Sequence, residues 1–346
     1  MSEFNIQNTI SEEEFRYTQE VIKKLSDYYD NVVVGQENLK FALIHAIMAD
    51  GHILIESVPG LAKTTAAKAI ARAVDADFSR IQCTPDLLPS DIIGTQIYNQ
   101  HKAKFETVKG PVFANFVLLD EINRSSAKTQ SAMLEAMQEK QVTIADETFK
   151  MPEDVFIVIA TQNPIEQEGT YPLSEAQTDR FLIKETLTYP TPEEEAAILS
   201  RISFGQKDEP AVLSVEDITN IQKITDKVYL DNSIKKYIAQ LVHATRNTSS
   251  LLKEEYSKYV KLGASPRASI ALMKMSKAVA LSNNRTYVIP EDVKAIRHQV
   301  LRHRISLTYS AKSDKVTPEM IIDQIFDNIP TPWGLHEKNS YRRYWT

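Results

Sequence analysis

The 346-residue sequence has little cysteine and little glycine. Its single cysteine, Cys83, excludes an internal disulfide and any metal site built from cysteines alone. The 9 glycines fall well below the roughly 7% of an average protein. No glycines have the spacing G-x-G-x-x-G, so the dinucleotide-binding fingerprint is absent. The strict phosphate-binding loop G-x-x-x-x-G-K-[ST] is absent as well, although a close variant is present.

The sequence also lacks long hydrophobic runs and an excess of positive charge. No uncharged apolar run approaches the roughly 18 residues of a membrane span, and the longest, such as 116–119 and 155–160, have the length of strands. The acidic, polar N-terminus does not resemble a signal peptide. The net charge of −6 argues against binding nucleic acid by bulk charge. We therefore expect a cytoplasmic protein without nucleic-acid partners or membrane insertion, which would reach a membrane only through partner proteins.

The hydrophobic pattern predicts an α/β domain over residues 1–188. Short, continuously apolar runs are typical of strands buried on both faces of a parallel sheet. Such runs alternate here with helix-like stretches, which favours an α/β arrangement. An N-terminal helix precedes them, with Ser11 and Glu14 spaced as a capping box. The expected helices cover 11–30, 63–74 and 126–138, and the expected strands cover 52–56, 116–120 and 155–161.

The pattern changes after Tyr189. Thr191 followed by Pro192 and two glutamates is a typical helix start, and Ser214 begins a second one. No convincing strand run follows, so we expect an all-helical second domain over 189–330 and a loosely held tail over 331–346. Further helices are expected over 232–248, 266–282 and 290–305, and loops over 205–210 and 246–250.

The segment 56–65, ESVPGLAKTT, lies between an expected strand and an expected helix, which is the context that a phosphate-binding loop requires. Backbone N–H groups in such a turn face an anion. Lys63 can reach the β- and γ-phosphates, and Thr64 can offer its hydroxyl to Mg²⁺. The alternative is an ordinary strand–loop–helix connection with a surface lysine, and the loop sequence by itself leaves both interpretations open.

Two residues depart from the strict loop motif. Ser57 stands where the first glycine belongs, and Ala62 stands where the second belongs. We expect little effect from Ala62, because a position that enters a helix can carry a Cβ atom. We expect Ser57 to matter more, because a side chain there would impose backbone strain that glycine avoids.

Polar residues follow the other two expected strands. Asp120 and Glu121 end one strand, at the sheet edge where open α/β folds bind ligands. Asp120 can hold the Mg²⁺ ion, and Glu121 can orient and polarise the attacking water. Asn163 follows the next strand and can sense the γ-phosphate. The alternatives are a pair of solvated acids and a turn asparagine before proline.

At this point the sequence resembles the MoxR family of AAA+ ATPases, over residues 33 to about 330. The resemblance rests on long strings: VPGLAKTT, GPVFANFVLLDEINRSSAKTQSAMLEAMQEKQVTI, ATQNPIEQEGTYPLSEAQTDRF, GASPRASIAL and YVIPEDVKAI. It implies an AAA+ P-loop NTPase core with a parallel sheet, followed by a helical lid. The family usually has glycine at the position of Ser57, whereas Ala62 fits its pattern. Segments 84–91 and 141–152 resemble the family's two extra elements, a helix insertion and a hairpin.

The resemblance also implies residue roles. Asn163 matches the first sensor, Arg180 the arginine finger that reaches the γ-phosphate of a neighbouring subunit, and Arg267 the second sensor on the lid. Arg124 is a weaker candidate for a phosphate or intersubunit contact. The catalytic set is then Glu121, Asn163, Arg180 and Arg267, with Thr64 and Asp120 on Mg²⁺. The expected ATP-binding residues are Gly35, Gln36, Ser57, Val58, Pro59, Gly60, Leu61, Ala62, Lys63, Thr64 and Thr65.

The function implied by the resemblance is ATP hydrolysis, as a homo-hexamer, coupled to chaperone-like maturation of protein complexes or to metal cofactor insertion. Partners in that family often carry a von Willebrand factor A domain. Three alternatives stay open. A weakly hydrolysing scaffold is favoured by Ser57 and opposed by the intact acid pair. A nucleic-acid motor is opposed by the acidic charge. A small-molecule kinase would leave the lid and the finger without a purpose.

Overall fold

The computed structural model describes residues 9–58, 60–164, 169–204, 210–248 and 254–332. A five-stranded parallel sheet, ordered β2-β5-β8-β1-β9, lies at the centre of the first domain. Its three inner strands, β5, β8 and β1, are buried along almost their whole length. The strand bounds are β1 Ile53–Glu56, β2 Phe78–Gln82, β5 Phe116–Asp120, β8 Ile157–Gln162 and β9 Ile183–Thr186.

The three predicted strands are confirmed as β1, β5 and β8, whereas the two edge strands, β2 and β9, were not predicted. The sequences of β2 (FSRIQ) and β9 (IKET) are largely polar, because an edge strand is covered less completely than a middle strand. In β5, Leu118 joins one apolar cluster and Leu119 joins the other, on the opposite face of the sheet. The sheet therefore has a core on each face.

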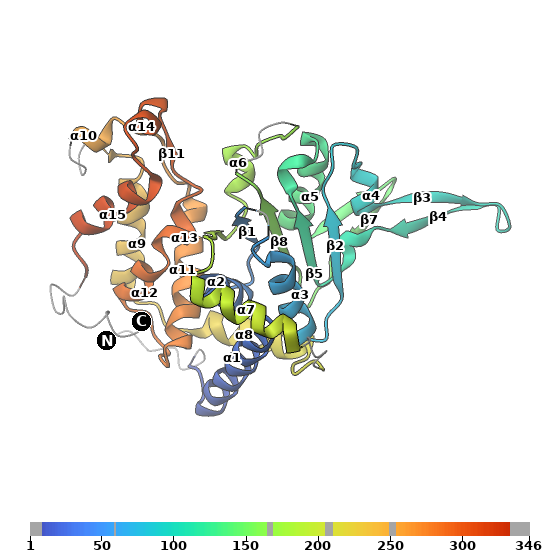
Figure 1. Cartoon of the computed structure of the whole chain (residues 1–346), viewed down its shortest axis with the longest axis horizontal. Helices are drawn as coiled ribbons and strands as arrows, with labels where there is room; N and C mark the ends of the chain where they lie inside the picture. Colours follow the sequence, from blue (N-terminus) through green and yellow to red (C-terminus); the bar gives the residue numbers. More distant parts are fainter. Residues whose placement is uncertain (1–8, 59, 165–168, 205–209, 249–253, 333–346) are drawn as a thin grey trace.

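Helices cover both faces of the sheet. The predicted capping box is present, since the Ser11 hydroxyl accepts a hydrogen bond from the Glu14 N–H and the Glu14 carboxylate accepts one from the Ser11 N–H. Figure 1 shows α1, α7 and α8 running below the sheet, and α1 packs against α2, α3 and α8. The helix bounds are α1 Glu12–Val32, α2 Glu37–Met48, α3 Lys63–Ala73, α5 Ala127–Glu139, α6 Glu175–Thr178, α7 Pro192–Phe204 and α8 Val215–Lys227.

Two hairpins project from the α/β domain. The expected helix insertion is α4 (Pro89–Ile93), but it continues into a hairpin that was not predicted, β3 (Gly94–Asn99) and β4 (Lys104–Lys109). This hairpin extends far from the body of the molecule (Figure 1). The expected second hairpin is confirmed as β6 (Gln141–Ile144) and β7 (Glu147–Lys150). Short 3₁₀ turns, Pro111–Phe113 and Ile122–Arg124, precede and follow β5.

In the described residues of the C-terminal region, helices predominate and a small two-stranded sheet is present. Strands β10 (Val260–Leu262) and β11 (Ser306–Leu307) pair antiparallel, so the all-helical expectation was wrong in this detail, because such short strands leave no alternation in the sequence. The expected helix over 290–305 is two helices that meet at Ile296. The helices are α9 Asn232–Ala244, α10 Glu254–Ser257, α11 Pro266–Ser282, α12 Pro290–Ala295, α13 Arg297–Leu301, α14 Tyr309–Ser313 and α15 Pro318–Asn328.

The helical region shares a core with the α/β domain. One apolar cluster extends from α3 and one face of the sheet, through α1 and α2, to α8, α9 and α11. The predicted division at residue 188/189 falls between β9 and α7. Most of the expected tail, and the loop residues 205–209 and 249–250, lie outside the described residues. Among the helices of the described segments, none combines the length and the apolar character needed to span a bilayer.

His52 joins three elements at the edge of the sheet where the strands begin. It directly precedes β1, its Nδ1 accepts a hydrogen bond from the Val158 N–H of β8 (3.1 Å), and its Nε2 donates to the Met137 carbonyl at the end of α5 (3.1 Å). Both ring nitrogens are therefore satisfied in the neutral form. Burial lowers the pKa of His52 to about 4.

This burial predicts a loss of stability in mild acid. The unfolded chain binds a proton on His52 near pH 6.5, whereas the folded chain does not. The contribution of neutral His52 to the free energy of unfolding is therefore fully present above that pH and is lost as the pH falls toward 4. In urea titrations at pH 7 and pH 5, we expect the fall in unfolding free energy to be about 2 kcal/mol smaller for His52→Asn than for wild type. An equal fall in both proteins would contradict this account.

Candidate active site

The loop, the acid pair and Asn163 meet at one edge of the sheet. Because β1, β5 and β8 are parallel neighbours, the segments that follow them emerge together. A cavity of about 290 Å³ lies there, lined by residues 60–65 with Asp120 and Glu121. Most of the predicted loop residues and both predicted acids therefore surround one space.

The loop presents a helix N-terminus and a lysine to this cavity. Lys63 begins α3, an 11-residue helix, and its ammonium group donates to the Ser57 carbonyl at 3.4 Å. The side chain is buried, which leaves the ammonium few competing water contacts. Unpaired N–H groups and the dipole make such a helix start attractive to phosphate. Pro59, which was predicted to contact the nucleotide, lies outside the described residues.

The expectation about loop strain was wrong. Ser57 is not among the non-glycine residues with positive φ in the described chain, and its hydroxyl donates to the Val58 carbonyl at 3.0 Å. The left-handed positions are Gly60 (φ 87°) and Ala62 (φ 54°). Ala62 is the residue just before α3, where the chain turns into the helix. The strain therefore falls at Ala62, which carries a Cβ atom in a conformation that favours glycine.

Thr161, on β8, holds both acids in place. Its hydroxyl donates to Asp120 Oδ1 (2.9 Å) and accepts the Glu121 N–H (2.8 Å). Glu121 has a left-handed backbone (φ 59°), so its side chain leaves the strand direction directly after Asp120. Asp120 is buried, which disagrees with the alternative of two freely solvated acids. Arg124 forms an ion pair with Glu121 (3.2 Å) rather than standing free for phosphate.

The remaining residues predicted for this edge lie near the loop. Asn163 is buried directly after β8, and its carbonyl accepts a hydrogen bond from the Asn123 amide (3.3 Å). Gln36, at φ 57°, reaches the Thr188 carbonyl just beyond β9 (3.5 Å). Gly35 has φ 65°, which favours glycine, and a Cβ atom there would lie 2.4 Å from Glu194 Oε1 and displace that side chain. Gly35 and Gln36, expected to bind ATP, thus lie near the end of the last strand.

Arg180 and Arg267 lie at the opposite edge. Arg180 precedes β9, and its guanidinium donates to the Leu134 carbonyl (2.8 Å). Arg267, in the first turn of α11, donates to Gln138 (3.2 Å). Both line a separate cavity of about 250 Å³ with His52 and Leu182, the residues that precede β1 and β9. The structure therefore does not bring either arginine to the phosphate loop of its own chain.

Comparison with known proteins shows the family of the chain. The sequence-family model for the ATPase family associated with various cellular activities (AAA) matches residues 52–183. The sequence-family model for the AAA lid domain matches residues 253–325. The chain is 46% identical to the chaperone MoxR1 of Mycobacterium tuberculosis, over 87% of this chain and 80% of that protein. The chain belongs to the MoxR family of AAA+ ATPases. Its members include a chaperone, and the chain is accordingly a nucleotide-binding ATPase.

Two further relatives cover nearly the whole chain. The Bacillus subtilis protein YeaC is 44% identical, over 90% of this chain and 95% of its own length. A crystal structure of a Cytophaga hutchinsonii protein, provisionally assigned as an ATPase, is 48% identical and superposes with a TM-score of 0.86, over 92% of this chain and 97% of that one. The MoxR fold predicted from the sequence, with its parallel sheet and C-terminal lid, is therefore confirmed.

Sequence analysis missed two residues that contact the acids, Arg80 and Gln82, because it missed strand β2. Arg80 forms an ion pair with Asp120 Oδ2 (2.5 Å) and donates to Gln82 (2.9 Å). Gln82, paired in register with Asp120, donates to Glu121 Oε2 (3.3 Å). Residues two apart on a strand share a face, so this edge strand holds both acids from one side. An arginine and a glutamine at that spacing beside an acidic strand end were the available signal.

The loop geometry predicts opposite effects for two glycine substitutions. Ala62→Gly should raise the unfolding free energy by about 0.5–1 kcal/mol, because relief of the left-handed strain exceeds the entropic cost of glycine. Ser57→Gly should lower it by about 0.5–1 kcal/mol, because it relieves no strain. Urea titration of both variants measures this difference. Stabilisation by Ser57→Gly would restore the original expectation about strain.

Proposed function

We propose that this MoxR ATPase hydrolyses Mg²⁺–ATP at sites shared between neighbouring copies of a hexamer, and that the cycle remodels partner proteins. One observation supports the proposal above the others. The loop and the acids lie at one edge of the sheet, while the arginines expected at the γ-phosphate lie at the other. Each copy therefore carries two complementary half-sites.

The chain's own groups fit a phosphate bound with a cation. Lys63 and the N-terminus of α3 would bind the β- and γ-phosphates. The Thr64 hydroxyl and the buried Asp120 carboxylate line the same cavity and are the oxygen donors that Mg²⁺ prefers, so they would hold it. When bound, the ion would offset the negative charge of the phosphates.

Glu121 is the candidate general base. Its carboxylate borders the cavity, and its backbone is fixed through Thr161. Gln82 donates a hydrogen bond to its Oε2 and Arg124 forms an ion pair with the same oxygen, so the carboxylate that would orient a water molecule is held in place. Asn163, buried at the end of the adjacent strand, would position that water against the γ-phosphate.

The opposed half-sites support a ring. Contact between one edge of a copy and the opposite edge of the next is heterologous, and such a contact builds a ring when its repeated rotation returns to the first copy. Arg180 and Arg267 of one copy would then stabilise charge on the phosphates bound by its neighbour. The hexamer itself rests on the resemblance described above.

The lid and the β3–β4 hairpin would couple the ATPase cycle to a partner protein. Arg267 lies on α11, which packs against α2, α8 and α9. A change at the neighbour's nucleotide that moves Arg267 would therefore move α11 and the helices packed against it. The β3–β4 hairpin exposes Tyr98 and Phe105, whose rings contact edge to face, and it would contact the client. The clients proposed are protein complexes under maturation or metal loading, including proteins with a von Willebrand factor A domain.

The direct test is steady-state ATPase activity with and without Mg²⁺. We expect wild type to turn over ATP, chelation with EDTA to abolish turnover, and Glu121→Gln to reduce kcat by about 10²–10⁴-fold while ATP still binds. Glu153→Gln, an exposed glutamate paired with Lys150 outside the site, is the matched control and should match wild type.

Two results would decide against the proposal. ATP binding without turnover by assembled wild type would indicate a scaffold. Equal turnover by Glu121→Gln and wild type would remove the general base from Glu121. If wild type is active, the slow Glu121→Gln assembly can be used to isolate clients.

A further inference from the structure

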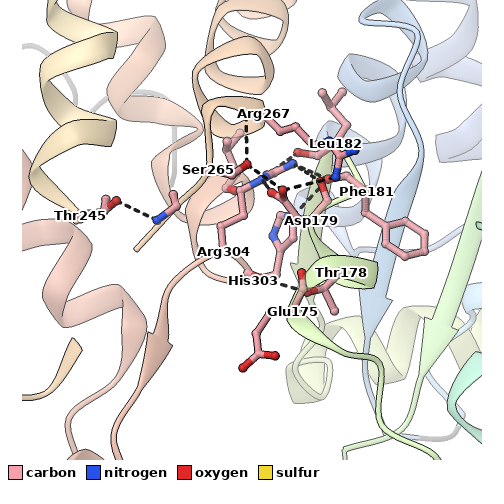
Figure 2. A network of polar contacts seen from close by, with 12 residues as sticks. Glu175, Thr178, Asp179, Phe181, Leu182, Thr245, Ser265, Arg267, His303 and Arg304 are labelled. Carbon is pink, nitrogen blue, oxygen red and sulfur yellow. Dashed lines mark hydrogen bonds and ion pairs between the residues drawn. The ribbon is translucent and has the colours of Figure 1, made fainter. Parts of the chain in front are cut away.

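Arg304, just beyond α13, is buried against the segment that carries Arg180. Its side chain is 2% exposed, and its Nε donates to Asp179 Oδ1 at 2.9 Å. The other guanidinium nitrogens donate to backbone carbonyls of Asp179 (3.4 Å), Phe181 (2.5 Å) and Leu182 (3.0 Å), and of Val300. Figure 2 shows these contacts converging from the helical region onto the start of β9. The backbone on both sides of Arg180 is thus bound to one guanidinium.

Asp179 connects the same guanidinium to the start of α11. Its Oδ2 accepts the Ser265 hydroxyl at 2.7 Å and lies 3.7 Å from the Arg267 guanidinium. Ser265 also caps α11, because its hydroxyl accepts the Arg267 N–H at 3.1 Å. The two oxygens of one carboxylate therefore reach two different parts of the helical region (Figure 2).

We infer that Arg304 and Asp179 are positioning residues that hold Arg180 and Arg267 in one fixed arrangement for the nucleotide of a neighbouring copy. This inference rests on the proposed function, in which both arginines act on the neighbour. Neither positioning residue touches the nucleotide. They act by fixing the positions of the Arg180 and Arg267 side chains.

Burial explains why this arrangement is stiff. Taking a guanidinium out of water is costly unless a carboxylate and hydrogen bonds replace its hydration, and Asp179 with the carbonyls supplies them. Burial lowers the pKa of Arg304 to about 10, so the side chain stays charged at neutral pH. Separating the two side chains would leave the Arg304 guanidinium buried without its carboxylate, which is costly. A shift of the helical region therefore carries the Arg180 segment with it.

Mixed assemblies of two inactive proteins test the inference. An acceptor subunit carries Arg180→Ala and keeps its phosphate loop. A donor subunit carries Lys63→Ala and keeps its arginines. Each alone should be inactive, and a mixture with donor in excess should regain ATPase activity where an acceptor loop meets donor arginines. Light scattering confirms that the two proteins assemble together.

Asp179→Asn is then placed in one subunit at a time. In the donor, it should lower the regained kcat by about 10–100-fold without changing KM for ATP, because misplacement by about 1 Å costs this much. In the acceptor, it should leave the regained activity unchanged, because that subunit already lacks the finger. Damage to the fold would lower activity in both placements, so the asymmetry identifies positioning.

Two further variants keep the test decisive. Arg304→Lys keeps the charge but loses the planar fork, and should show the same asymmetry. Asp292→Asn breaks another buried ion pair of the helical region, to Arg285, with no link to Asp179. In the donor, it should leave the regained activity unchanged, which controls for general weakening.

The outcomes separate the two proposals. If donor and acceptor assemble together without regaining activity, the shared site of the proposed function is wrong. If they regain activity and Asp179→Asn has no effect in the donor, or the same effect in both subunits, the positioning role is wrong while the shared site stands.

Discussion

The parallel pairing of the five strands is the constraint on which the rest of this structure depends. Because all five run in one direction, every segment that follows a strand lies at one edge of the sheet and every segment that precedes a strand lies at the other. The phosphate loop, Asp120 and Glu121 follow strands. Arg180 precedes β9, and Arg267 packs beside the residues that precede β1 and β9. A single chain therefore holds the two proposed halves of the catalytic site at opposite edges, and in the proposed function a neighbouring copy joins them.

The helical region determines how firmly the second half is held. It shares an apolar core with the sheet through α1, α2 and α8, so its position is fixed over a large buried surface. Arg304 then fastens it to the Arg180 segment, and Ser265 fastens the start of α11 to Asp179. The positions of both arginines therefore depend on the position of the helical region. In a ring, this gives a physical route from nucleotide state in one copy to lid position in the next.

Sequence patterns predicted the strands that are buried on both faces and the helix starts that depend on local caps. Continuous apolar runs identified β1, β5 and β8, and caps identified the starts of α1, α7 and α8. Edge strands β2 and β9 were not predicted, because a half-covered strand such as FSRIQ keeps polar residues. Arg80 and Gln82 were missed together with β2. Contacts between distant segments escaped too, since nothing local links Arg304 to Asp179, 125 residues earlier. Ala62 was misjudged because backbone angles, not residue type alone, decide where strain falls.

The shared site is the central claim, and the dependence of ATPase activity on protein concentration tests it most directly. Turnover per subunit and mean particle mass would be measured together across a dilution series. The account predicts that turnover per subunit rises in proportion to the assembled fraction and falls to background for the dilute single copy. Constant turnover per subunit, with monomers as active as assemblies, would show that one chain completes its own site and would contradict the account.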